Sequence, residues 1–480
     1  MGKGATLALE VKPEGREPLF LALARALIAD IERGRLPPGT ALPGTRALAA
    51  SLGMHRNTVD AAYQDLILQG WLVSVPSRGT FVARDLPDCP QLRPVDPVLP
   101  DREHAVRPAP LPFSLSDGTP DPRLAPVVAL AQAIRRALLS PSFLSCRDYG
   151  DPCGHPLLRE ALALYLRDER GLAVRPAQVM ITRGSQMALF LAARALGRAG
   201  AVIAVETPGY PLAWRAFQAA GVQVVGVPVD GEGLDVEALE RLAGSQPGLV
   251  AVYLTPHHQY PTTVTLGAAR RLRLLDLVRR HDLVIIEDDY DHEYRFEGRP
   301  LLPLAARNHA QDRVIHVGSL SKLIAPGLRI GYAIAPPALL ERMAGQREAI
   351  DRQGDGPLEQ ALGELLADGT LRRHARKARR LYLARRDRLV SLLRATLADR
   401  TDFAVPAGGL AVWLRLRGEV ELVDQWVQQA AALGLAVLPG RQFSLTPAAP
   451  PAALRLGFAA LSEDELEQAV GVLVRACPVG

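Results

Sequence analysis

The chain has 480 residues, 48% hydrophobic and 22% charged, a composition typical of soluble globular proteins that disfavours fibrous, disordered or membrane-embedded classes. Apolar runs are too short for a membrane span, the N-terminus lacks a secretory apolar core, and four scattered cysteines show no metal-ligand spacing, so we expect a cytoplasmic protein without a metal site. The net charge is +5, and residues 1–84, with 10 Lys/Arg and 7 Asp/Glu, hold +3 of it, which hints at a polyanionic partner.

The first 84 residues predict a small helical domain that ends in a β-hairpin. Apolar residues recur at helical spacing from Leu19 to Ile31, and Gly34 ends that run. Thr45 is expected to cap a second helix, and Gly70 to end a third. The predicted elements are helices over 18–34, from Thr45, and from about His55 to Gln69, then strands over 71–75 and 80–82.

Two short helices, a tight turn and a hairpin favour a winged helix-turn-helix. The first turn of the third helix is polar, and in such domains that turn meets base edges in the major groove of DNA. Wing residues and a basic residue of the second helix would meet phosphates or the minor groove. A helical protein-interaction module remains the alternative. The candidate DNA-binding residues are Arg46, His55, Arg56, Asn57, Thr58, Arg78 and Gly79.

Residues 85–112 contain eight prolines and no periodic apolar pattern, which predicts an extended, semi-rigid linker. From about residue 113, apolar strand-like runs alternate with helical ones, which indicates a mostly parallel α/β sheet covered by helices. From about residue 357 a long basic helix, 372–397, leads into a smaller α+β piece. The strands predicted for the large domain are 201–205, 222–227, 249–254, 283–287, 314–317 and 330–334.

Lys322 lies in the segment Gly318-Ser319-Leu320-Ser321-Lys322, directly after the predicted strand 314–317. Open α/β sheets bind ligands at the carboxyl ends of their strands. A lysine in such a turn can form a Schiff base with an aldehyde cofactor, of which pyridoxal 5'-phosphate (PLP) is the common one. A surface lysine is the alternative for this segment alone.

Four further features fit a PLP site. Asp288 follows a predicted strand, where its carboxylate would keep the pyridine nitrogen protonated, and Tyr290 could bond the phenolic oxygen. Gly184, Ser185 and Gln186 open a helix whose exposed N–H groups would bind phosphate. Arg329, with the hydroxyls of Ser319 and Ser321, would reach the same phosphate. Arg455 interrupts an apolar strand, where a ligand carboxylate or a structural acid would pair with it.

These motifs carry resemblances to known families. Residues 18–84 resemble the GntR-type winged helix through Gly34-Arg35-Leu36, Arg56-Asn57-Thr58-Val59 and Gly79-Thr80-Phe81-Val82. Residues 113–480 resemble fold-type I aminotransferases through Tyr149-Gly150-Asp151-Pro152, Pro208-Gly209-Tyr210 and Ala325 to Tyr332. Many aminotransferases have Asn-Pro-Thr-Gly where this chain has Tyr260-Pro261-Thr262-Thr263. The domain order, with His258-Gln259-Tyr260-Pro261, looks like the MocR-type transcription regulators.

The resemblance implies a function and a set of site residues. It implies PLP bound to Lys322 as an internal aldimine, with Tyr210 against the ring and Arg455 taking a carboxylate. It also implies a homodimer that binds double-stranded operator DNA and responds to PLP or an amino-acid-like effector. A catalytically active aminotransferase with a fused DNA-binding domain is the alternative, and a large domain that serves only as a dimerisation scaffold is a third hypothesis.

Overall fold

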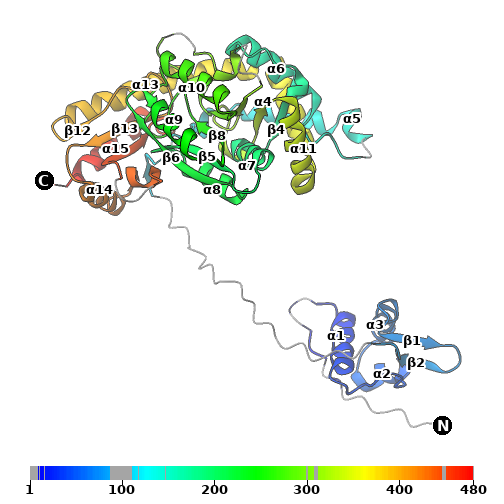
Figure 1. Ribbon diagram of the computed structural model, residues 1–480. Helices are drawn as coiled ribbons and strands as arrows, with labels where there is room; N and C mark the ends of the chain where they lie inside the picture. The colour runs from blue at the N-terminus through cyan, green and yellow to red at the C-terminus, as the bar shows by residue number, and fades with distance from the viewer. Residues whose placement is uncertain are drawn as a thin grey trace. The chain divides into compact units, whose positions relative to one another are not determined.

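The computed structural model describes residues 9, 11–13, 15, 17–86, 111–116, 118–145, 148–298, 301–307, 312–445 and 450–478. Contacts divide the chain into two compact units, residues 1–107 and 108–480 (Figure 1). Most of the predicted linker, residues 87–110, lies outside the described residues. Within the described ranges, no helix is both long and apolar enough to cross a membrane.

The N-terminal unit has three helices and a hairpin. Its elements are α1 (Leu19–Glu32), α2 (Thr45–Leu52), α3 (Arg56–Leu68), β1 (Leu72–Val75) and β2 (Gly79–Val82). The strands pair antiparallel from Leu72 opposite Val82 to Val75 opposite Gly79. Gly79 has φ +110°, a backbone conformation that suits glycine at the end of the wing turn. The winged helix-turn-helix fold predicted from the sequence is confirmed.

One apolar core holds this unit together. Leu23 and Leu27 of α1, Leu48 of α2 and Val59 and Leu66 of α3 are all fully buried. Each lies on the inward stripe that helical periodicity produces. The prediction that Thr45 caps α2 is wrong, because Gly44 occupies the cap position and no side chain bonds the first turn. Thr45 is instead the first helical residue.

The C-terminal unit is built on an eight-stranded sheet with the order β4-β11-β10-β9-β8-β5-β6-β7. Five neighbouring strands run parallel to one another: β10, β9, β8, β5 and β6. Strand β11 runs antiparallel to both of its neighbours, and β7 runs antiparallel to β6. The strands are β4 (Val179–Thr182), β5 (Val202–Thr207), β6 (Gln223–Asp230), β7 (Gly233–Leu234), β8 (Leu249–Leu254), β9 (Val284–Asp289), β10 (Val314–Ser319) and β11 (Gly331–Ile334).

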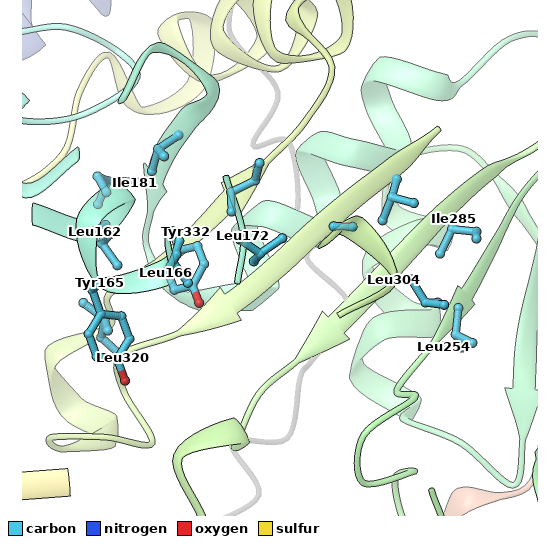
Figure 2. Packing of buried hydrophobic residues seen from close by; sticks show 14 of the residues in the cluster. Leu162, Tyr165, Leu166, Leu172, Ile181, Leu254, Ile285, Leu304, Leu320 and Tyr332 are labelled. Carbon is cyan, nitrogen blue, oxygen red and sulfur yellow. The ribbon is translucent and has the colours of Figure 1, made fainter. Parts of the chain in front are cut away.

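Helices pack on both faces of this sheet. Side chains alternate along each strand, so Val202 and Ala204 of β5 join one core cluster while Ile203 and Val205 join another. Figure 2 shows part of the first cluster, including Leu162 and Ile285. The helices are α4 (Val127–Leu138), α5 (Pro141–Leu144), α6 (Pro156–Arg170), α7 (Gly184–Leu196), α8 (Pro211–Ala219), α9 (Val236–Ser245), α10 (Ala268–Arg280), α11 (Pro337–Asp351) and α12 (Gly356–Ala367).

The long helix α13 (Thr370–Leu397) leads from this sheet into a smaller α+β part. That part has its own core and a sheet of order β12-β13-β16-β15. The strand β3 (Phe113–Ser114) pairs in parallel with β14 (Leu435–Ala436), so the start of the unit contributes to its smaller part. The remaining elements are β12 (Thr401–Asp402), β13 (Ala411–Leu416), β15 (Leu438–Pro439), β16 (Ala453–Gly457), α14 (Val420–Ala432) and α15 (Glu463–Arg475).

Short 3-10 helices complete the unit, and two of them border the sites described below. The six are η1 (Pro122–Leu124), η2 (Pro176–Gln178), η3 (His292–Tyr294), η4 (Leu304–Ala306), η5 (Pro326–Leu328) and η6 (Gly440–Phe443). The predicted fold class, a mostly parallel sheet with a small C-terminal α+β domain, is confirmed.

Candidate functional site

A cavity of about 200 Å³ lies at the carboxyl ends of the central strands. Strand β9 ends in Asp288 and Asp289, and β10 ends in Ser319, three residues before Lys322. The parallel register puts Val317 beside Asp288, so the two strand ends lie at the same edge of the sheet. Eight of the predicted residues line this cavity: Ser185, Tyr210, Asp288, Tyr290, Ser319, Ser321, Lys322 and Arg329.

Lys322 presents its amine to the cavity from a half-buried turn. Its Nζ donates a hydrogen bond to the carbonyl oxygen of Gly118 at 2.7 Å. Its own carbonyl oxygen accepts a hydrogen bond from the hydroxyl of Tyr294 at 3.0 Å. These contacts hold both ends of the lysine, with its amine at the cavity.

The carboxyl group of Asp288 is buried, and only one of its two oxygens has a hydrogen-bond partner among the described residues. Its Oδ2 accepts a hydrogen bond from the hydroxyl of Tyr253 at 3.0 Å. Its Oδ1 has no hydrogen-bond partner among the described residues, although it is fully buried. Burial raises the pKa of Asp288 to about 7, and the nearby charge of Asp289 adds to that rise. A buried acceptor of this kind fits a protonated ring nitrogen.

Arg329, which lines the cavity, contacts Gly184 at the start of α7. Arg329 has φ +52°, and its NH2 donates to the carbonyl oxygen of Arg183 at 3.1 Å. Gly184, the first residue of α7, has φ +73°, and a Cβ added there would lie 2.6 Å from that same NH2. Only glycine therefore allows this close approach. A guanidinium beside a helix N-terminus fits a phosphate group.

The serines beside Lys322 shape the turn as well as line the cavity. The backbone N–H of Ser321 donates to the hydroxyl of Ser319 at 3.2 Å, and the Ser321 hydroxyl donates to the carbonyl oxygen of Ile330 at 3.2 Å. Gln186 is placed differently, because its side-chain amide donates to the carbonyl oxygen of Leu212 at 2.5 Å and is not among the cavity-lining groups. Only its backbone remains as a candidate phosphate ligand.

Tyr260 lines the cavity, which the sequence interpretation did not predict. Its ring lies 5.0 Å from that of Tyr210 and 6.0 Å from that of Tyr290, centroid to centroid, both edge to face. The guanidinium of Arg455 lies 4.2 Å from the Tyr260 ring, and its NH1 donates to the carbonyl oxygen of Pro261 at 2.9 Å. Arg455 is buried behind Tyr260 and does not itself line the cavity.

Four other lining residues were not predicted as site residues either: Thr119, Tyr253, Thr255 and Pro326. Thr255 connects the cavity to a buried acid, because its N–H and its hydroxyl both donate to Glu206, at 3.0 and 2.8 Å. Burial raises the pKa of Glu206 to about 7. In the sequence, only Glu206, a glutamate near the end of an apolar strand, could have indicated a buried acid beside this cavity.

The cavity fits PLP on chemical grounds. A lysine amine, a buried carboxyl oxygen without a partner among the described residues and an arginine beside a helix start line the same cavity. These three features match the aldehyde, the ring nitrogen and the phosphate of that cofactor. Tyr290 donates to the carbonyl oxygen of His258 at 3.0 Å, which holds its hydroxyl at the cavity wall.

The candidate DNA-binding residues belong to α2, to the start of α3 and to the hairpin between β1 and β2. Arg46, Arg56 and Arg78 are exposed, and none of them forms an ion pair with another described residue. Asn57 and Gly79 are exposed and Thr58 is half-buried. His55 also has a structural role that was not predicted. Its Nδ1 accepts a hydrogen bond from the N–H of Asn57 at 3.2 Å and so caps α3.

Comparisons with known proteins agree with this architecture. The model of the family "Bacterial regulatory proteins, gntR family" matches residues 20–82, and that of "Aminotransferase class I and II" matches residues 114–473. The probable rhizopine catabolism regulatory protein MocR of Rhizobium meliloti is 33% identical over 95% of this chain and 93% of its own length. The pyridoxine biosynthesis transcriptional regulator PdxR of Corynebacterium glutamicum is 35% identical over 85% of each chain.

Among solved structures, an archaeal alanine:glyoxylate aminotransferase matches with a TM-score of 0.72 and 30% identity, over 78% of this chain and 92% of that one. The family implies dependence on PLP and binding to DNA. The chain belongs to the MocR-type family of transcription regulators, in which a GntR-type winged helix-turn-helix precedes an aminotransferase-like domain.

Proposed function

We propose that this transcription regulator senses its ligand at Lys322. Binding of PLP there, alone or together with an amino-acid-like effector, alters the affinity of the regulator for operator DNA. The observation that carries the proposal is the buried, unpartnered Oδ1 of Asp288 in the same cavity as the lysine. A buried polar atom without a partner is costly, so a ligand that satisfies it stabilises the fold.

Each residue has a separate task in this proposal. When bound, PLP supplies a carbonyl carbon that condenses with primary amines and a ring that withdraws electrons. Lys322 would provide the amine and Asp288 would hold a proton at the ring nitrogen. Tyr290 would donate to the phenolic oxygen once its hydroxyl turns from the carbonyl oxygen of His258. The phosphate is bound by Arg329, Ser319, Ser321 and the first N–H groups of α7, from Gly184 to Gln186. Tyr210 packs against the ring.

An effector with a carboxylate would reach Arg455 after the Tyr260 ring turns aside. In the structure that ring lies over the guanidinium and also lines the cavity. The relative PdxR is named for pyridoxine biosynthesis, which makes PLP itself the first effector to test. A ligand shifts the regulator only through unequal affinity for two conformations, and the Tyr260 position supplies a local difference between them.

DNA binding is assigned to the predicted residues of the winged helix. Arg56, Asn57, Thr58 and His55 would face base edges, while Arg46, Arg78 and Gly79 would face phosphates or the minor groove. We also propose a homodimer in the cytoplasm. Exposed apolar side chains on α4 and α5, among them Val128 at 73% and Leu144 at 69% exposure, support a self-association surface.

A spectroscopic titration tests the cofactor part. The full chain should gain a visible absorbance band on addition of PLP, and Lys322→Ala should lack it. The same samples, given an amino acid and a keto acid, test the alternative function. Many turnovers per site would favour an active aminotransferase, whereas ligand-dependent DNA affinity without turnover supports the regulator.

A further inference from the structure

A second cavity, of about 150 Å³, lies behind β9. Its walls come from α6, the loop after β8, η3 and the first half of α13. Consecutive strand residues point to opposite faces of a sheet. Asp288 faces the Lys322 cavity, and Asp289 pairs with Arg170 and His257, which line the second cavity. We call this second cavity the basic pocket.

Positive charge dominates the basic pocket. Five arginines line it, against only two glutamates, Glu169 and Glu293. Asp289 lies beneath the pocket and neutralises one of the five, Arg170, as their ion pair is fully buried. Although burial alone would raise the pKa of Asp289, the charge of Arg170 holds it well below its usual range. Arg372 is likewise paired, with Asp168 and Glu169, so the positive charge that remains in the lining belongs to Arg295, Arg376 and Arg379.

The arginine donors that line the pocket are not all used. Both Nε and NH1 of Arg295 are buried and have no hydrogen-bond partner among the described residues. Burial lowers the pKa of Arg295, and the nearby charge of Arg170 lowers it further. Each of these N–H groups can donate to an oxygen of a carboxylate or a phosphate, the anions that an arginine binds well.

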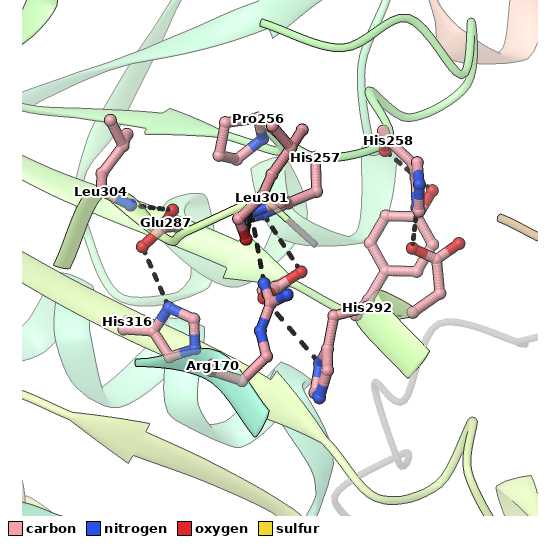
Figure 3. Close-up of polar contacts among 12 residues, drawn as sticks. Arg170, Pro256, His257, His258, Glu287, His292, Leu301, Leu304 and His316 are labelled. Carbon is pink, nitrogen blue, oxygen red and sulfur yellow. Dashed lines mark hydrogen bonds and ion pairs between the residues drawn. The ribbon is translucent and has the colours of Figure 1, made fainter. Parts of the chain in front are cut away.

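The histidines and the buried Glu293 add little negative charge that would repel an anion from the basic pocket. Figure 3 shows Arg170, His257 and His292 gathered in one network. Glu293 lies 3.1 Å from His292 and accepts from the hydroxyl of Tyr165 at 3.4 Å. Burial raises the pKa of Glu293 to about 8, so at neutral pH it is mainly a neutral acid that can donate a hydrogen bond.

The rim of the pocket gives access from solvent. Arg376 and Arg379 are exposed, lie three residues apart on one face of α13, and form no ion pair within the described chain. A water molecule takes about 30 Å³ of liquid volume, so the pocket has room for roughly five water-sized groups. That size suits a phosphate ion or a short-chain carboxylate.

We propose that the basic pocket is a second ligand site, which binds a small anion carrying a carboxylate or a phosphate. Arg295 donates to the anionic group from its buried N–H groups, and the exposed Arg376 and Arg379 contribute positive charge from α13. The site is separate from the Lys322 cavity but borders it, because His258 lines the pocket while its carbonyl oxygen accepts from Tyr290.

Calorimetric titration of the full chain, saturated with PLP, tests this proposal. The probes are sodium phosphate, sodium succinate and the neutral analogue succinamide, at constant ionic strength. One test variant is Arg376→Gln/Arg379→Gln, and Arg295→Gln is the second. The matched control is Arg380→Gln/Arg394→Gln, which removes the same charge from exposed positions of α13 outside the pocket.

The proposal expects saturable binding of phosphate or succinate, but not of succinamide, to the wild-type protein. Whichever anion binds more tightly identifies the source of the anionic group. Affinity should fall by about tenfold in the pocket variants and by less than about twofold in the control. Circular dichroism should show that each variant is folded. The proposal is overturned if neither anion saturates, if no folded pocket variant binds more weakly, or if the control is weakened as much.

Discussion

Asp288 and Asp289 are consecutive residues of β9 whose carboxyl groups serve opposite faces of the sheet. Asp288 accepts from Tyr253 and turns its second oxygen into the Lys322 cavity. Asp289 pairs with Arg170 in the basic pocket. The two environments push the pKa values apart, to about 7 for Asp288 and well below the usual range for Asp289. One strand end thus joins two cavities of different chemistry.

Asp288→Asn should change stability with pH in the cofactor-free protein. Because the folded pKa of Asp288 is raised, this group favours the folded state at low pH and loses that contribution between about pH 4 and about pH 7. The variant should therefore gain free energy of unfolding relative to wild type as pH rises, by on the order of 1–3 kcal/mol near pH 8. Paired urea titrations at about pH 5.5 and about pH 8 measure the difference.

The same substitution should weaken binding of the cofactor, although it stabilises the cofactor-free fold. An amide cannot hold the ring nitrogen protonated, so Asp288→Asn should weaken PLP binding and shift its absorbance band. Equal affinity and an unchanged spectrum would mean that Asp288 does not meet the ring.

Gly184→Ala should weaken PLP binding without unfolding the domain. The new Cβ would lie 2.6 Å from the Arg329 guanidinium in a backbone conformation with φ +73°. Moving Arg329 away removes a hydrogen bond to the phosphate, which should reduce affinity by about tenfold or more. Gly244→Ala is the matched control, because nothing lies within 4 Å of the added Cβ there. Fluorescence titration with PLP compares the two variants, and equal affinities would argue against a phosphate at Gly184.

Arg56→Ala should weaken operator binding by about 1–3 kcal/mol for each hydrogen bond that the arginine makes to a base edge. Arg33→Ala removes the same charge from an exposed position at the end of α1 and should have a much smaller effect. Gel shifts on the protein's own upstream region, over a range of salt concentrations, measure both. Similar reductions in affinity in the two variants would indicate that only net charge matters.

His55 offers a way to separate helix capping from base contact. Its Nδ1 caps α3, so His55→Ala should destabilise the N-terminal unit by about 1 kcal/mol. His55→Asn restores a good cap and should recover that stability. If His55 also contacts a base, the His55→Asn variant will still bind the operator more weakly than wild type. Thermal unfolding measures the stability, and gel shifts on the same samples measure operator binding.

The sequence predicted the parts of this protein that depend on local pattern. Strand periodicity located β5, β8, β9, β10 and β11 to within a few residues, and strand ends led to Lys322 and Asp288. Helical spacing located the winged helix. In contrast, β3 has two residues and pairs with β14, more than 300 residues later, so no local pattern could reveal it.

The missed site residues depend on tertiary packing. Tyr260 follows no regular strand, and its direction is set by contacts with Tyr210, Phe443 and Arg455. For the same reason the placement of Arg455 behind an aromatic ring could not be foreseen. The basic pocket combines residues from α6, η3 and α13. The sequence predicted the long basic helix 372–397, but not its packing against α6 and η3.

The most direct test of the central claim is the affinity of the full chain for its own upstream DNA, measured by fluorescence anisotropy with and without PLP and a panel of amino acids. We predict that ligand changes the Kd of wild type by about 5- to 150-fold, the usual range of coupling between sites. In Lys322→Ala the Kd should stay the same with and without ligand. Equal ligand responses of the two proteins, or no response in either, would contradict the claim that Lys322 is the input to DNA binding.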